Sequence, residues 1–193
     1  HALGVIGREH HCRRAGVAVW AYCLMPNQVH LILVPSDPDG LRAALGEAHR
    51  RYTRHVNSRE DWRGYLWQGR FASHAMDEPH LLAAARYVEL NPVRAKLARR
   101  AGDWRWSSAR AHLAGRDDGC VATRPLLDLA PDWRAFLRGG LSEDEHRAIR
   151  AAERTGRPLG SDRFIARLEK RLGRSLARQK PGPKPKAANG RRG

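Results

Sequence analysis

Two polar side chains begin an otherwise apolar segment, and their spacing would let them share a ligand. Residues 28–34 read Gln-Val-His-Leu-Ile-Leu-Val, and the side chains of a β-strand alternate between its two faces. Gln28 and His30 therefore project from one side, where an amide oxygen and an imidazole nitrogen could bind one metal ion. The residues alone leave open an alternative, a solvated glutamine at the strand entry and a hydrogen-bonded core histidine.

A tyrosine and an asparagine four residues apart form the second candidate pair. Tyr87 and Asn91 fall within a predicted helix, where residues four apart lie one above the other on one face. A phenol and an amide on one helix face make a candidate functional pair. The alternative is a core tyrosine followed by an asparagine that ends the helix.

The elements that would position these residues follow from hydropathy patterns and from turn residues. A run of β-branched and aromatic residues predicts a strand at 17–24, and the turn Pro26-Asn27 leads to an antiparallel strand at 28–34. Apolar spacing predicts a helix at 41–56, a strand is expected around 66–73, and a helix should begin near Pro79 and stop before Pro92. A small helical region should follow Trp104, with further helices around 142–153 and 161–172.

Composition narrows the class of protein. The chain has 193 residues and a formal charge of +16, and it lacks an apolar run long enough for a membrane-spanning helix. Residues 163–193 hold eleven Lys and Arg against one acid, Glu169, so about +10 of the charge lies there. Such a field attracts polyanions, although a solubilising tail would have the same composition. Three dispersed cysteines argue against a disulfide scaffold and favour a reducing compartment.

Several motifs give these residues a family context. The segments Tyr22–Leu33 (YCLMPNQVHLIL) and Ala85–Ala95 (ARYVELNPVRA) resemble the single-tyrosine transposases of the His-hydrophobic-His class. WQGRF at 67–71 and WRWSSA at 104–109 are similar to the bacterial branch associated with repetitive extragenic palindromes, and TGRPLGS at 155–161 extends the likeness more weakly.

The resemblance implies a ferredoxin-like α+β fold that nicks hairpin-bearing single-stranded DNA. It makes Tyr87 the nucleophile that forms a 5′-phosphotyrosine link, and it makes His30 and Asn91 ligands of Mg²⁺ or Mn²⁺. Gln28 stands where the family has histidine; as a weaker ligand it would lower metal binding or activity about 10–100-fold, or end cleavage altogether. The DNA contacts we expect come from arginines, namely Arg50, Arg51, Arg54, Arg70 and Arg94.

The same resemblance predicts the organisation of the chain. We expect a catalytic domain at 1–115, a helical C-terminal extension at 116–177 and, from the lack of apolar residues, a disordered basic tail at 178–193. In this tail KPGPKPK at 180–186 is similar to the minor-groove hook of architectural proteins, and a solvated linker is the alternative. The family fold begins with a strand and a helix, and residues 1–16 can supply only the end of that helix. We therefore expect a fragment of a longer chain that lacks the N-terminal strand.

Two other functions remain open from the sequence. The protein can be a non-catalytic regulator that binds DNA hairpins, or, less in keeping with its residues, a basic RNA-binding module, which lacks an aromatic stacking motif. The resemblance favours a monomer over a dimer. It also implies a bacterial protein of the cytoplasm that associates with the nucleoid and takes no small-molecule substrate.

Overall fold

The computed structural model describes residue 12 and residues 14–177 and has an α+β architecture. Strands β1 (Val17–Leu24) and β2 (Val29–Pro35) pair antiparallel, and the backbone N–H of Met25 donates to the Gln28 carbonyl to close the turn between them. Both predicted strands are confirmed to within one residue. The predicted N-terminal truncation and the tail at 178–193 lie outside the described residues.

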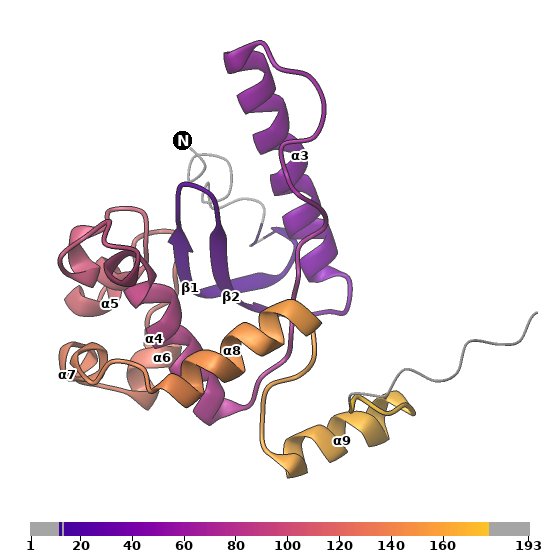
Figure 1. The fold of residues 1–193 in the computed structure, drawn as a ribbon, viewed down its shortest axis with the longest axis vertical. Coiled ribbons are helices and arrows are strands. Elements are labelled where there is room, and N and C mark those ends of the chain that lie inside the picture. The colour runs from indigo at the N-terminus through magenta and orange to yellow at the C-terminus, as the bar shows by residue number, and fades with distance from the viewer. Residues whose placement is uncertain (1–11, 13, 178–193) are drawn as a thin grey trace, which may run out of the picture.

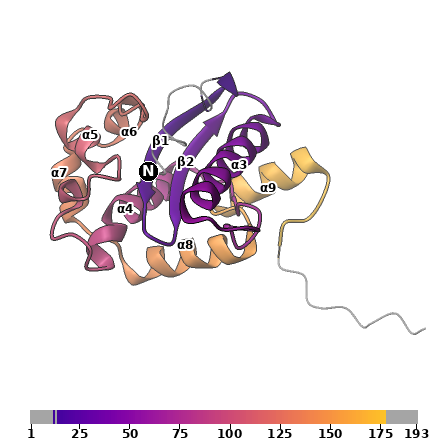
Figure 2. The ribbon, with the colours of Figure 1, turned by 90° about the horizontal axis from the view of Figure 1, so that it is seen from above.

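Two long helices flank this sheet (Figures 1 and 2). Helix α3 (Gly40–Glu60) buries Ala44, Leu45 and Ala48, and it continues past the predicted end at residue 56. Helix α4 (Glu78–Arg94) packs against β1 and β2, with Asp77 as its N-cap and a proline in the first turn, as expected.

The predicted stop before Pro92 is wrong, because α4 continues to Arg94 with Pro92 inside the helix. The last turn is stabilised by hydrogen bonds that do not need the missing N–H of proline. The backbone N–H of Ala95 donates to the Asn91 carbonyl at 2.9 Å, and that of Leu97 donates to the Pro92 carbonyl at 2.8 Å. The bias against helical geometry before proline is a preference, which buried packing of Pro92 overrides in this helix.

The strand predicted around residues 66–73 is also wrong. This segment is irregular, and after it Met76 makes only an isolated bridge to Leu159. Its apolar side chains serve a different purpose, because the Trp67 ring stacks on His49 of α3 with centroids 4.1 Å apart. The segment therefore packs on a helix and does not extend the sheet.

Short helices follow α4 and gather beside it (Figure 1). They are η1 (Ala101–Asp103), α5 (Ala109–Ala114), α6 (Arg124–Leu129) and α7 (Trp133–Arg138). The sequence did not predict α6 and α7, since six residues are too few to show a helical repeat. The two helices predicted near the C-terminus are confirmed as α8 (Glu143–Thr155) and α9 (Asp162–Leu172).

One hydrophobic core joins the sheet, α4 and the helices that follow it. It includes Ala21 and Ile32 from the strands, Val88 from α4, Leu126 from α6 and Ile149 from α8. Helix α8 therefore packs directly into the core, alongside α4 (Figure 2).

A buried carboxyl group organises the centre of this core. Glu89 of α4 accepts hydrogen bonds from the Ser108 hydroxyl at 2.6 Å and from the Trp133 indole N–H at 2.7 Å, and the Nδ1 atom of His112 lies 2.6 Å from it. These partners come from the α5 region and α7, so Glu89 fixes α4 to the elements that follow it. No helix in the described part of the chain has both the length and the apolar character needed to cross a membrane.

Asp77 links the starts of two helices, and this link should make the fold sensitive to acid. Its carboxylate accepts from the backbone N–H of His80 in α4 and, at 2.7 Å, from that of Ser161, the N-cap of α9. Burial alone would raise the pKa of Asp77, but the hydrogen bonds from Ser161 and His80 outweigh it and lower the pKa to about 2.

Because the folded pKa lies below the unfolded value of about 3.9, Asp77 stabilises the fold above that pH, and the contribution is lost as the pH falls toward 2. We expect Asp77→Ala to cost about 1 kcal/mol at pH 7, as the loss of a helix cap does. Urea unfolding at several pH values should show a smaller loss of stability between about pH 4 and pH 2 in the variant. An identical acid profile for both proteins would contradict this role.

Candidate active site

Tyr87 lies at the meeting point of α4, the sheet and α8. Tyr87 is buried, with only 2% of its surface exposed to solvent. Its ring meets the His30 ring edge-on, with centroids 5.7 Å apart and planes at 84°, and its hydroxyl donates a hydrogen bond to Glu153 Oε2 at 3.3 Å. The predicted nucleophile and one predicted ligand are therefore neighbours.

His30 and Gln28 contact each other at the start of β2. The His30 Nε2 atom lies 3.2 Å from Gln28 Oε1, and Nδ1 lies 3.5 Å from Glu153 Oε1. The alternation of side chains along the strand had predicted that these two residues share a face. Both ring nitrogens of His30 consequently face oxygen atoms, and a metal ion could bind the ring only in exchange for one of these contacts.

Glu153 of α8 is the group that connects these residues. One carboxylate oxygen faces the Tyr87 hydroxyl, the other faces His30, and the Arg150 guanidinium lies 3.6 Å away. Burial alone would raise the pKa of Glu153, but the interactions with His30, Arg150 and Tyr87 outweigh it and lower the pKa. Glu153 is therefore a stable anion at neutral pH and a weak base.

Asn91 lies one helical turn beyond Tyr87, as the spacing predicted, and is buried. Its Nδ2 atom is enclosed and has no hydrogen-bond partner among the described residues. A buried amide left in this state is a group that a ligand could satisfy. No hydrogen bond joins Asn91 to His30 in the described part of the chain, so these two predicted ligands are not linked to each other directly.

The donor chemistry of the site fits a hard divalent cation in part. No group of three or more His, Cys, Asp or Glu side chains in the described residues is placed to hold a metal ion. The predicted set relies instead on oxygen donors, the amides of Gln28 and Asn91, together with the His30 ring. Such a mixture suits Mg²⁺ or Mn²⁺ better than a closed zinc site. The Asn91 atom that lacks a partner among the described residues is Nδ2, however, which is a hydrogen-bond donor and not a cation ligand.

Cationic side chains surround the Tyr87 ring. The Arg94 guanidinium lies over the ring, 4.7 Å from its centroid, and donates toward His146 Nε2 at 2.8 Å. The His146 ring is 5.8 Å from that of Tyr87, and the interaction of Arg150 with the Tyr87 oxygen raises the pKa of Arg150. A phosphate group brought to Tyr87 would therefore meet the positive charges of Arg94 and Arg150.

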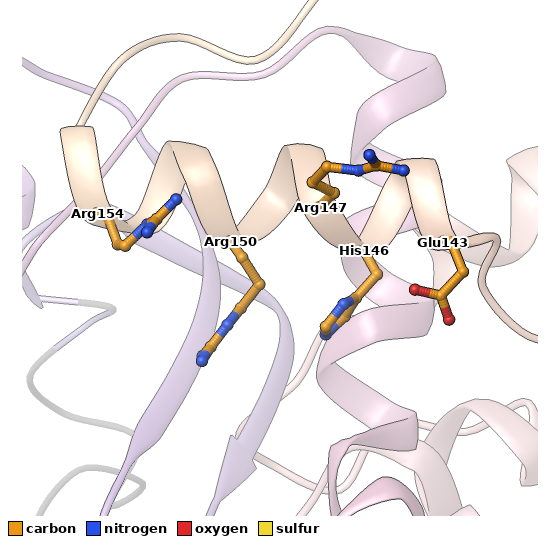
Figure 3. Close-up of a pocket in the computed structure, with 5 residues that line it drawn as sticks. All are labelled: Glu143, His146, Arg147, Arg150 and Arg154. Carbon is orange, nitrogen blue, oxygen red and sulfur yellow. The ribbon is translucent and has the colours of Figure 1, made fainter.

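An open pocket of ≈ 450 Å³ lies along α8 beside these residues (Figure 3). Figure 3 shows the His146 and Arg150 side chains pointing from α8 toward the strands and α4. The pocket is lined by one acid and four nitrogen-bearing side chains: Glu143, His146, Arg147, Arg150 and Arg154. Its charge and open shape suit an anionic chain.

The arginines expected to contact DNA fall into different environments. Arg50 and Arg51 on α3 both pair with Glu47, whose pKa they lower to about 2. Arg54 and Arg70 are exposed and form no ion pair with any other residue that the structure describes. Arg94 lies against Tyr87 and so belongs to the candidate site itself.

Sequence reasoning missed the contribution of α8, above all Glu153, Arg150 and His146. The i, i+3 and i, i+4 spacing of these residues places them near one another on the helix. The sequence offered no signal, however, that this helix packs over a tyrosine 66 positions away.

The chain matches no protein-family model, no curated protein and no solved structure.

Proposed function

We propose that the protein is a DNA-nicking and strand-transferring enzyme that acts on hairpin-bearing single-stranded DNA, with Tyr87 as nucleophile. The observation that carries the proposal is the meeting of the Tyr87 hydroxyl and the His30 ring at one carboxylate, beside a group of cationic side chains. The motifs that resemble single-tyrosine transposases contribute both Tyr87 and His30. The site therefore joins what the sequence had proposed from separate segments.

The proposed reaction exchanges one phosphoester bond for another. The Tyr87 oxygen attacks the phosphorus atom of the scissile phosphodiester, and the bond from phosphorus to the 3′ oxygen of the preceding nucleotide breaks. The products are a 5′-phosphotyrosine link and a free 3′-hydroxyl, with the phenol proton released to water and one proton taken up by the leaving oxygen. Attack by a 3′-hydroxyl on the same link reverses the step and transfers the strand.

Positive charge would hold the reacting phosphate. Arg94, Arg150 and His146 converge on the Tyr87 ring, and guanidinium groups bind phosphate oxygens in pairs of hydrogen bonds. His30, Asn91 and Gln28 would hold a divalent cation, which withdraws charge from the phosphate and orients it for in-line attack.

The broader proposal follows the same resemblance. It includes a ferredoxin-like fold and a basic C-terminal extension that adds to DNA binding. It also holds that the protein is monomeric and acts at the bacterial nucleoid. Hairpin DNA is the proposed partner, and the net charge of +16 supports a polyanionic one.

Access to Tyr87 requires α8 to move, because its side chain is enclosed and Glu153 binds its hydroxyl. We expect Glu153→Ala to free the hydroxyl and to raise the initial rate of cleavage about 10–100-fold. This is the factor that corresponds to losing a hydrogen bond to a charged group, about 1.5–3 kcal/mol. A single-turnover cleavage assay measures it.

Asp39→Ala is the matched control for this variant, since Asp39 is an exposed acid that lies outside the candidate site and pairs with Arg42. It should cleave at the parental rate. A slower reaction in Glu153→Ala alone would contradict the role of Glu153 as a restraint and would make this carboxylate a participant in the chemistry.

The proposed activity is tested with hairpin-bearing single strands labelled at either end. In the presence of Mn²⁺, denaturing electrophoresis should show a protein-linked product only with the 3′-labelled strand and a shortened free product with the 5′-labelled strand. Binding of the hairpin without cleavage, in the full-length parent and in Glu153→Ala alike, would contradict the proposal.

A second function, hairpin binding without cleavage, is favoured by one observation. In the described arrangement Tyr87 is enclosed and both His30 nitrogens already face oxygen atoms. A binding protein of this kind holds the hairpin in a salt-dependent manner that chelators do not affect. Loss of binding on addition of a chelator would exclude it.

A further inference from the structure

Helix α3 and the segment 61–71 that returns along it form a projecting arm, which we call the α3 arm (Figure 1). The returning segment is held against the helix at two points. The Trp67 ring stacks on His49 and its indole N–H donates to the His49 carbonyl at 3.3 Å. Closer to the tip, the Asn57 amide donates to the Gly64 carbonyl at 3.0 Å. The arm is therefore an ordered projection.

The tip of the α3 arm, residues 61–66, exposes two aromatic side chains. Trp62 is 60% exposed and Tyr65 is fully exposed, whereas Trp67 in the same segment is packed on the helix. Aromatic rings of this size are normally covered, and exposed ones commonly mark an interaction surface. The backbone at Trp62 is fixed, because its N–H donates to the Asn57 carbonyl at 2.8 Å.

The charge of the arm indicates which kind of partner would cover these rings. Residues 50–70 contain six arginines against two carboxylates, Glu60 and Asp61, a net charge of +4. Arg54 and Arg63 are exposed and form no ion pair within the described chain. A second copy of the same tip would be repelled by this charge. Two rings on a turn also lack the apolar helix face with which proteins bind membrane surfaces.

We propose that the tip of the α3 arm binds unpaired bases of single-stranded DNA, with Trp62 and Tyr65 stacking on the bases and the arginines facing the phosphates. Flat apolar rings within a cationic surface match the alternation of bases and phosphates along a single strand. The proposal rests on the proposed function, because it assigns a second contact to the same DNA. Helix α3 is about 30 Å long and its tip lies away from α4 and α8, so these bases are distant from the phosphate at Tyr87.

The test compares two DNA hairpins of equal charge, one blunt and one with an unpaired flank, by fluorescence anisotropy with the full chain. The double variant Trp62→Ala/Tyr65→Ala should bind the flanked hairpin at least about tenfold more weakly, the loss expected for base stacking. Its affinity for the blunt hairpin should stay close to that of the parent. Leu97→Ala, which removes an exposed apolar side chain from the segment after α4, is the matched control and should change neither affinity.

Equal loss for both hairpins, or no loss for either, would overturn the assignment. So would a double variant that loses binding to anionic phosphatidylglycerol vesicles and keeps its affinity for the flanked DNA. The result of this binding test can be distinguished from the result of the cleavage test of the proposed function. A flank-specific loss in a protein that never cleaves DNA supports the stacking surface and rejects the enzyme. Cleavage without any flank-specific loss of affinity supports the enzyme and rejects the stacking surface.

Discussion

Tyr87→Phe should abolish both DNA cleavage and the covalent protein–DNA product, with a loss of at least about 10³-fold in rate. The variant removes only the oxygen that would attack the phosphate and that now donates to Glu153. The ring remains, so its contacts with His30, His146 and Arg94 should persist. Single-turnover cleavage of a labelled hairpin measures the effect, and anisotropy should show unchanged DNA binding.

Tyr22→Phe provides the matched control for this experiment. Tyr22 is another enclosed tyrosine, and its hydroxyl also donates to a carboxylate, that of Asp118, at 2.6 Å. It lies in a different cluster, packed with Val19 and Leu24, and should retain cleavage. Equal loss in both variants would mean that these tyrosine hydroxyls matter for stability, and retained cleavage in Tyr87→Phe would remove Tyr87 from the chemistry.

Glu89→Ala should destabilise the fold by about 3–5 kcal/mol, more than the loss of a helix cap or of an exposed ion pair. The substitution leaves the Ser108 hydroxyl, the Trp133 indole N–H and the His112 ring without their shared acceptor in a site closed to water. His112 Nε2 already has no hydrogen-bond partner among the described residues, so the ring has little else to bind. Urea unfolding followed by circular dichroism measures the change.

Glu60→Ala is the control, because Glu60 is exposed at the end of α3 and pairs only with Arg59 in the described chain. Its loss should cost less than about 1 kcal/mol, as exposed ion pairs do. A Glu89→Ala protein as stable as Glu60→Ala would show that the buried cluster does not hold α4 in place. Since Tyr87 lies on the same helix, the Glu89 cluster also supports the position of the candidate nucleophile.

The spacing of apolar residues correctly predicted those helices and strands whose own sequence contains the periodicity and end signals of the element. The strands at 17–24 and 29–35 and the helices α8 and α9 carry their own periodicity and end signals, such as the Ser142 and Ser161 caps. The strand prediction around Trp67 was wrong because an apolar run can pack on a helix as well as in a sheet. The prediction that α4 stops before Pro92 was wrong because residues beyond the proline complete the helix with backbone hydrogen bonds.

The candidate site was predictable only where one element contains both partners. Gln28 with His30, and Tyr87 with Asn91, share a strand or a helix, so their spacing relates them directly. That Tyr87 meets His30 is a tertiary contact between α4 and β2, and it was expected only through the family resemblance. The position of Glu153 depends on how α8 packs through Ile149 and Ala152, which no local pattern specifies.

The central claim is that the Tyr87 oxygen becomes linked to a 5′ phosphate of DNA. The covalent product of the Mn²⁺ reaction can be digested with nuclease and trypsin and its peptides sequenced by mass spectrometry. The account predicts a nucleotide phosphate attached to Tyr87 in the tryptic peptide Tyr87–Arg94. A nucleotide on any other residue, or nicked DNA with this peptide wholly unmodified, would contradict it.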